Sequence, residues 1–304
     1  MELITGENDK GRRLDRILRK ALADHPLPFI HRLLRQKKVL VNGKAAKADD
    51  RLDSGMKICI PSLPGSHYTK PKKERLTETV LPSFEILWQG QGLLAVNKPP
   101  GLAVHGTDSL ESIIRNYLKD KLPESLSFKP GPLHRLDKPS SGVVVFSSSL
   151  DGARLFSALL REQKIRKTYL AVVKGNLEDE RIWEDILIRD SEKKKTFISG
   201  GQSGKNAVTK VTPLKHRGNL TLIKAEISTG RTHQIRAQSA SHGHPLAGDV
   251  KYGGGFSGVI GGFFLHAWKL EFLDFVIEAP LPEDRERLYS EEVTALLECV
   301  FKFL

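Results

Sequence analysis

The segment PGPLHRLDKPSSGVVVF, residues 130–146, places a loop rich in proline and glycine directly before a continuous apolar run. Proline and glycine mark loops, and a short run such as Val143–Phe146 is typical of a strand buried on both faces. Asp137 lies in this loop between Arg135 and Lys138, so we expect a carboxylate on a rigid support, kept ionised by neighbouring cations. Taken alone, a single Asp in a loop more often caps a turn or pairs with a lysine.

Strand-like and helical runs flank this segment without regular alternation. Runs rich in β-branched and aromatic residues predict strands, and amphipathic runs predict helices. Strands outnumber helices and no repeated βαβ order occurs, which favours an α+β domain with a mixed, largely antiparallel sheet. The predicted strands are residues 84–88, 93–96, 142–146, 168–173, 220–227 and 263–272, and the predicted helices are residues 110–118, 151–160, 232–241 and 291–303.

The net charge of +12 is concentrated near the N-terminus, where residues 1–75 hold 18 Lys and Arg against 9 Asp and Glu. Such an asymmetry within one compact segment indicates a module that binds a polyanion, and nucleic acid is the favoured partner. The alternative is a solvated basic face that only aids solubility.

Two short helices followed by a hairpin are predicted within this basic segment. Apolar residues recur at helical spacing over 14–22 and again over 30–34, and Asn42-Gly43 is a strong hairpin signal. Residues 12–61 contain RLDRILRKAL, IHRLLRQKKVLVNGKAAK and DRLDSGMKICIP in order, and they resemble the S4 domain, also called the alpha-L motif. This small domain binds RNA, which implies a set of RNA-binding residues: Arg12, Arg13, Arg16, Arg32, Arg35, Lys37, Lys38 and Lys44.

Residues from about 84 to 275 resemble the RluA family of pseudouridine synthases. The run from His134 to Gly142 is similar to the catalytic motif of that family, and four further motifs accompany it in the family's order. They are LAVNKPPGLAVH (94–105), RKTYLAVVKG (166–175), STGRTHQIRAQSASHGHPLAGDVKYGG (228–254) and FFLHAWKLEF (263–272). The resemblance implies the pseudouridine synthase fold and an isomerase that converts uridine to pseudouridine in structured RNA without a cofactor.

The same resemblance implies the roles of four residues. Asp137 would be the catalytic carboxylate that acts on the ribose, either by attack on the sugar or through a glycal. Tyr169 would pack on the flipped base and accept the proton from carbon, and Arg236 would pair with Asp137. Arg135 would fill or brace the stack vacated by the target base, since extruding a base costs roughly a few kcal/mol. His134 is expected to position the loop and to take no part in the chemistry.

Three other functions compete with this interpretation. A metal hydrolase or nuclease could use His233, His242, His244 and Asp249, or His134 with Asp137, but their spacings match no standard metal motif, so no metal site is predicted. The run 200–206 is a poor phosphate-binding loop and is better interpreted as a flexible, RNA-facing loop. A non-catalytic ribosome-assembly protein would keep the basic N-terminal region, but Asp137, Tyr169 and Arg236 are all present.

The sequence thus predicts an S4-like domain over 12–61, a linker over 62–78 and a catalytic domain over 79–304. Two cysteines far apart support neither a disulfide framework nor a cysteine-rich zinc site, and no signal peptide or membrane span is evident, so a cytoplasmic protein is expected. Large-subunit ribosomal RNA is the preferred target and transfer RNA the second choice. A monomer is expected, because no long exposed apolar helix or heptad pattern occurs.

Overall fold

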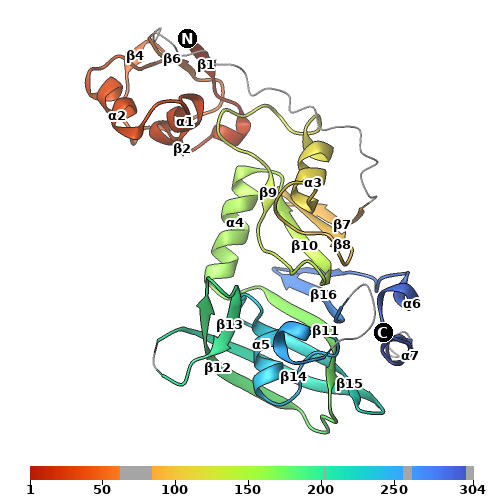
Figure 1. Ribbon diagram of the computed structural model, residues 1–304. Coiled ribbons are helices and arrows are strands. Elements are labelled where there is room, and N and C mark those ends of the chain that lie inside the picture. The colour runs from red at the N-terminus through yellow and green to blue at the C-terminus, as the bar shows by residue number, and fades with distance from the viewer. Residues whose placement is uncertain (62–83, 202, 256–261, 299–304) are drawn as a thin grey trace.

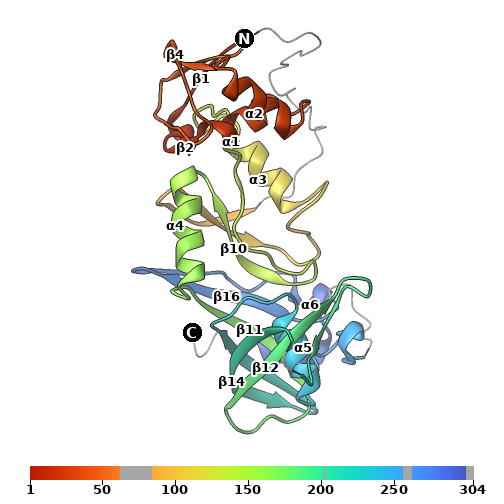
Figure 2. The same cartoon turned by 90° about the vertical axis from the view of Figure 1, so that its left-hand side faces the viewer.

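The computed structural model describes residues 1–61, 84–201, 203–255 and 262–298. The N-terminal unit, residues 1–61, lies at one end of an elongated molecule, above one end of a large sheet (Figures 1 and 2). The predicted linker, 62–78, lies outside the described residues, so the domain boundaries stay a prediction. Within the described residues, no helix combines the length and apolar character that crossing a membrane requires.

The N-terminal unit packs two helices against a small sheet. Leu14, Ile17 and Leu18 recur on one helix face and are fully buried, as expected for an amphipathic helix. Asn42 and Gly43 both have positive φ, 48° and 78°, which suits the predicted hairpin turn. The sheet order is β1-β6-β3-β4, with a separate β2-β5 pair. The bounds are β1 Glu2–Ile4, β2 Arg12–Arg13, α1 Leu14–Ala21, α2 Leu27–Arg35, β3 Leu40–Val41, β4 Lys44–Ala45, β5 Arg51–Leu52 and β6 Lys57–Cys59; a 3-10 turn, η1, spans Glu7–Asp9.

The unit predicted to be catalytic, called the catalytic unit below, comprises the described residues from 84 to 298. Among these residues it is built on one sheet of 11 strands in the order β13-β12-β14-β15-β11-β16-β10-β8-β7, with β17 beside β16 and β9 beside β10. All its pairings are antiparallel except that of β10 with β16. The predicted α+β class with a mixed, largely antiparallel sheet is therefore confirmed. The strands are β7 Glu85–Gly90, β8 Leu93–Lys98, β9 Gly131–Pro132, β10 Ser141–Ser147, β11 Arg166–Lys174, β12 Arg181–Asp190, β13 Lys195–Ile198, β14 Lys205–Arg217, β15 Leu220–Ile227, β16 Leu265–Phe272 and β17 Phe275–Glu278.

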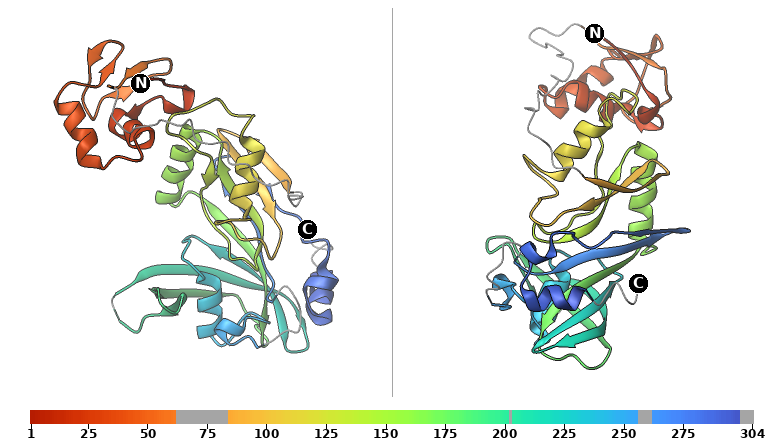
Figure 3. Two further views of the ribbon diagram at one scale, coloured as in Figure 1. Left: turned by 45° about the horizontal axis from the view of Figure 1, so that its top comes forward. Right: turned by 90° about the vertical axis from the view of Figure 1, so that its right-hand side faces the viewer.

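Helices lie beside this sheet at several places along its length (Figure 3). Ser109 and Ser149 cap the first turns of α3 and α4 by accepting a hydrogen bond from a backbone N–H. The bounds are α3 Leu110–Leu118, α4 Leu150–Arg161, α5 Gln234–Ser241, α6 Arg285–Leu288 and α7 Glu291–Leu297, with a 3-10 turn, η2, over Val250–Tyr252. Residues 299–303 of the last predicted helix lie outside the described residues.

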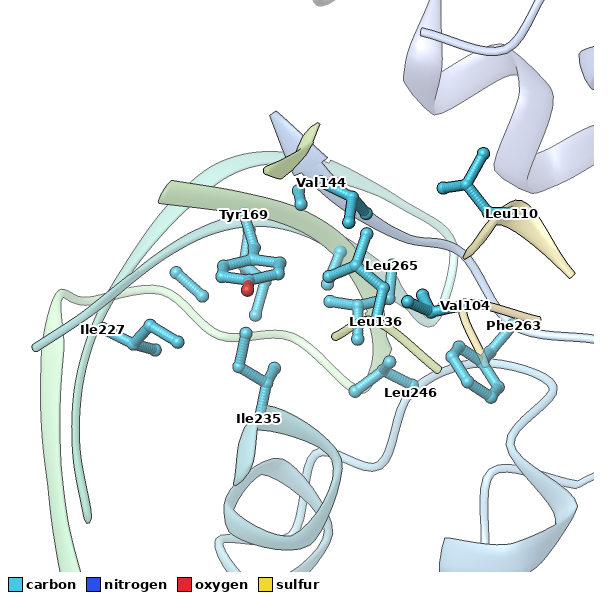
Figure 4. Close-up of a cluster of buried hydrophobic side chains, with 14 of the residues drawn as sticks. Val104, Leu110, Leu136, Val144, Tyr169, Ile227, Ile235, Leu246, Phe263 and Leu265 are labelled. Atoms are coloured by element: carbon cyan, nitrogen blue, oxygen red, sulfur yellow. The ribbon is translucent and has the colours of Figure 1, made fainter. Parts of the chain in front are cut away.

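One apolar cluster joins the central strands to the loop that carries Asp137. Leu136 is buried in it with Tyr169 of β11 and Ile235 of α5 (Figure 4). Because packed interiors tolerate little displacement, burial of Leu136 fixes the position of the residue that follows it.

The sequence predicts a loop over residues 200–206, but the structure places the end of this segment in a strand. Lys205 and Asn206 belong to β14 and pair with Leu187 and Ile186 of β12. The loop is therefore shorter than expected, and Gln202 within it lies outside the described residues.

Candidate active site

Asp137 lies in the loop between β9 and β10, and its side chain is 16% exposed. The loop backbone is hydrogen-bonded at Asp137 itself and at the residue that follows it. The carbonyl of Asp137 accepts the N–H of Ser140 over 3.1 Å, and the carbonyl of Lys138 accepts the N–H of Gly101 over 2.8 Å. The carboxylate is thus held at a partly open position by a loop with little freedom to move.

Arg236, in the first turn of α5, places its guanidinium against this carboxylate. Its Nη1 donates to Asp137 Oδ2 over 2.7 Å, across 99 residues of sequence. The structure therefore brings together the two residues that the family resemblance paired. A short charge-assisted hydrogen bond of this kind orients a carboxylate.

Asp249 holds the other edge of the same guanidinium. Arg236 Nε donates to Asp249 Oδ2 over 2.7 Å and Nη2 donates to Oδ1 over 2.9 Å, a two-bond fork that fixes the guanidinium plane. The rings of Tyr252 and Phe263 lie 5.0 Å and 4.4 Å from its central carbon. Burial disfavours the cation, but the hydrogen bonds and charges of both carboxylates outweigh it and raise the pKa of Arg236.

His233 lies on the other side of Asp137 and is uncharged at neutral pH. Burial lowers its pKa to about 4, although Asp137 acts in the opposite direction. Its Nε2 is 3.5 Å from Asp137 Oδ1, and its Nδ1 is 2.8 Å from the hydroxyl of Tyr252. When Tyr252 donates to Nδ1, the ring proton lies on Nε2 and faces Asp137. His233 thus adds a dipole beside the carboxylate without adding a charge.

Tyr169 forms an apolar wall near Asp137. It lies on β11, is 8% exposed and belongs to the same cluster as Leu136 and Ile235. Burial and the charge of Asp137 both raise the pKa of Tyr169, so the ring is a neutral phenol at neutral pH. An aromatic face beside a carboxylate is suited to stacking against a planar base.

Lys98, whose role the sequence does not predict, lies fully buried behind the loop. Its Nζ donates to the carbonyls of Pro99, Leu102 and Lys138 over 2.9, 2.6 and 3.1 Å. It therefore ties the turn after β8 to the loop that carries Asp137. Burial lowers the pKa of Lys98 to about 7, and the charge of Asp137 limits that decrease.

The depressed pKa of Lys98 predicts a pH-dependent stability. Above about pH 7 the folded protein releases a proton that the unfolded chain keeps until near 10.5, so the free energy of unfolding is expected to rise with pH in that window. The rise from this group is up to about 1.4 kcal/mol per pH unit. Urea unfolding at several pH values should show it in the wild type and not in Lys98→Met. Equal slopes for both proteins would contradict this assignment.

Other residues considered from the sequence lie outside this group. Arg135 is exposed and makes no hydrogen bond or ion pair with the described residues, so its predicted role in base flipping stays a prediction. Burial and the charge of Lys167 lower the pKa of His134 to about 3, and its Nε2 accepts the N–H of Val145 in β10. His134 is thus a neutral acceptor that fastens the loop to the sheet.

Three of the residues considered as metal ligands are directed to separate partners. His242 contacts Asp185, His244 contacts the carbonyl of Lys174, and Asp249 holds Arg236. Among the residues that the structure describes, no group of three or more His, Cys, Asp or Glu side chains is placed to bind a metal ion.

The basic residues predicted to bind RNA lie on the N-terminal unit, and most are exposed. Arg13 pairs with Asp15 over 2.9 Å, and Arg32 lies 5.1 Å from the centre of the Phe29 ring. Arg12 is half-buried. The exposed members are Arg13, Arg16, Arg32, Arg35, Lys37, Lys38 and Lys44.

The chain is similar to known proteins in both of its parts. A model of the RNA pseudouridylate synthase family matches residues 92–241, and a model of the S4 domain matches residues 12–58. The chain is 31% identical to the RNA pseudouridine synthase YlyB of Bacillus subtilis (strain 168), over 95% of this chain and 96% of that protein. It is 30% identical to ribosomal large subunit pseudouridine synthase C of Escherichia coli (strain K12), over 92% of each chain.

Solved structures show the same fold. Human RNA pseudouridylate synthase domain containing 4 superposes with a TM-score of 0.58 at 21% identity, covering 70% of this chain and 93% of that one. Human RNA pseudouridylate synthase domain containing 1 gives 0.55 at 20% identity, covering 73% and 96%. The chain therefore belongs to the RNA pseudouridylate synthases, in the RluA family whose motifs it carries, with an S4 domain in its N-terminal region.

Proposed function

We propose that this protein isomerises uridine to pseudouridine in large-subunit ribosomal RNA, with Asp137 as the catalytic carboxylate. The observation that carries the proposal is the 2.7 Å contact between Arg236 Nη1 and Asp137 Oδ2, at a partly exposed position beside the ring of Tyr169. A fixed, ionised carboxylate next to an aromatic wall is what a reaction on the sugar of a stacked uridine requires.

The reaction is a rearrangement within one nucleotide. The bond between N1 of the base and C1′ of the ribose breaks, and a bond between C5 and C1′ forms. C5 loses a proton and N1 gains one, so atoms and electrons balance without an oxidant, a reductant or a second substrate. For this reason we propose that the reaction needs no cofactor. Asp137 acts at the ribose, by attack on C1′ or by removal of a sugar proton to form a glycal.

Access to C1′ and C5 requires the target uridine to leave its stack, which costs roughly a few kcal/mol. We assign Arg135 to the space that the base vacates. It is exposed, lies two residues before Asp137 and is not engaged by other described residues. A planar guanidinium can stack on neighbouring bases.

Tyr169 is assigned to the base side of the reaction, as the group that packs on the uracil and relays the proton from C5: its neutral hydroxyl releases one proton as it accepts the other. We expect Tyr169→Phe to keep the fold and RNA binding, because the ring is retained, and to lower the rate of isomerisation by roughly 10²-fold or more. Single-turnover kinetics with RNA carrying tritium at C5 would measure this, since the tritium is released as pseudouridine forms. If Tyr169→Phe reacted as fast as the wild type, the role of Tyr169 would be limited to packing.

The same tritium-release assay tests which RNA is the target. The basic N-terminal unit and the names of the relatives that act on the ribosomal large subunit support ribosomal RNA as the substrate. We expect the wild-type protein to release tritium from an unmodified large-subunit ribosomal RNA transcript and not from transfer RNA. Release from transfer RNA alone would overturn the choice of target. Release from neither, with binding intact, would favour a non-catalytic role in ribosome assembly.

A further inference from the structure

The N-terminal unit is fastened to the catalytic unit by one buried carboxylate. Asp9, in η1, is fully buried, and it accepts four hydrogen bonds from the segment after α3. Ser125 Oγ and Ser127 Oγ donate over 2.7 Å each, and the N–H groups of Leu126 and Ser127 donate over 2.9 and 3.0 Å. A buried carboxylate with this many donors is a fixed connection, because removing the donors would leave a buried charge unsatisfied.

Three further contacts support this connection. Leu126 packs against the apolar core of the N-terminal unit. Asn8 Oδ1 accepts the N–H of Leu150 over 3.1 Å, at the start of α4, and Arg154 Nη2 donates to the carbonyl of Gly11 over 3.2 Å. The views in Figures 1 and 2 place the N-terminal unit against the loop after α3 and the first turn of α4.

Cations from both units converge along this junction. Arg154 donates to the carbonyl of Gly11, which directly precedes Arg12 in the chain. Arg115 donates to the carbonyl of Pro130, which directly follows Lys129. Partial burial and the charges of Lys129, Arg12 and Arg115 lower the pKa of Lys20, so these side chains are close enough to repel one another. We call the following six residues the junction cations: Arg12, Arg16 and Lys20 of the N-terminal unit, and Arg115, Lys129 and Arg154 of the catalytic unit.

The junction cations exceed the carboxylates available to them. Arg115 pairs with Glu111 and Arg154 with Asp151. Arg12, Arg16, Lys20 and Lys129 form no ion pair with any residue in the described ranges. Asp9 attracts Arg12, but its oxygens are already occupied by the Ser125–Ser127 segment.

Arg12 also carries a buried donor without an acceptor. Its Nε is shielded from solvent and has no hydrogen-bond partner among the described residues. Gathering like charges is unfavourable, and an anion bound near the guanidinium of Arg12 and its cationic neighbours offsets the repulsion between them. The excess positive charge of the junction therefore favours an anionic ligand.

We propose that the junction cations bind the phosphodiester backbone of the RNA substrate where it passes from the N-terminal unit to the catalytic unit. This inference rests on the proposed function, because the anion is identified as RNA on the basis that the protein acts on RNA. Arginine and lysine side chains spread over two units suit successive phosphates along a strand, and such contacts position an RNA without reading its sequence. Because Asp9 fixes the two units, RNA held at the junction enters the active site in a set register.

The test removes one charge from each unit, in Lys20→Gln/Lys129→Gln. Binding to a short RNA hairpin is measured by fluorescence anisotropy across a range of salt concentrations. Loss of two phosphate contacts is expected to weaken binding about tenfold at physiological salt and to make the plot of log K against log salt shallower by about 1 to 2. Lys164→Gln/Lys210→Gln, which removes two lysines paired with surface glutamates, is the matched control and should bind as the wild type does.

Thermal unfolding separates binding from a structural role. Removing like charges from the junction should leave the melting temperature unchanged or raise it, while RNA binding falls. Unchanged affinity and salt dependence would overturn the proposal, and so would weaker binding accompanied by a lower melting temperature. These outcomes concern binding alone. Failure of the proposed function would instead appear as absence of tritium release by the wild-type protein.

Discussion

Asp137→Asn is expected to abolish pseudouridine formation, with a loss of more than about 10³-fold in the single-turnover rate. The amide keeps an oxygen that can accept the hydrogen bond from Arg236 Nη1, but it has neither the negative charge nor the nucleophilicity of the carboxylate. The active site should therefore keep its geometry and lose its chemistry. RNA binding is expected to be unchanged, because Asp137 contributes no positive charge to the RNA-binding surface.

The control for this variant is Asp274→Asn, in the exposed turn between β16 and β17. It makes the same chemical change at the surface and should leave the rate of tritium release unaltered. Equal rates for Asp137→Asn and the wild type would remove Asp137 from the mechanism.

Arg236→Gln is expected to disrupt both stability and activity. It leaves Asp249, 2% exposed, and Asp137, 16% exposed, without their shared cation. Removing one partner of a buried ion pair lowers the free energy of unfolding by about 3–5 kcal/mol. We expect pseudouridine formation to fall by at least about 10²-fold, because Asp137 loses the donor that orients it. Chemical denaturation and tritium release would measure the two effects separately.

A second substitution distinguishes a positioning role from a purely structural one. In Arg236→Gln/Asp249→Asn the buried negative charge is also removed, so part of the lost stability should return. Activity should stay low, because Asp137 still has no cationic donor. Recovery of activity together with stability would show that Arg236 serves the fold alone.

Much of the fold could be predicted where one residue pattern dominates. The bounds predicted for 110–118 and 220–227 are those of α3 and β15, because these runs have clear apolar periodicity and definite ends. Strands β12 to β14 were not predicted. In β14 the inward residues are Ala207, Thr209 and Val211, so small and polar side chains hide the alternation that marks a half-buried strand. Pro213, at a register shift, obscures it further.

Part of the candidate site could also be predicted, from family motifs and not from apolar periodicity. Asp137 and Arg236 lie within recognisable motifs, so their pairing was expected from the sequence. Asp249 was considered only as a metal ligand, although a buried arginine must have more than one acceptor for its five N–H groups. That requirement could have indicated a second carboxylate, but only the fold shows which one. Lys98 was missed because its three carbonyl acceptors are set by the path of the backbone.

The most direct test of the central claim is to map pseudouridine across large-subunit ribosomal RNA in a strain that lacks the gene. The strain would be complemented with either the wild-type protein or Asp137→Asn at matched expression. We predict that at least one uridine stays unmodified in the deletion strain, becomes pseudouridine with the wild-type protein and stays uridine with the variant. Equal restoration by both proteins, or a ribosomal RNA map that the deletion leaves unchanged, would contradict the account.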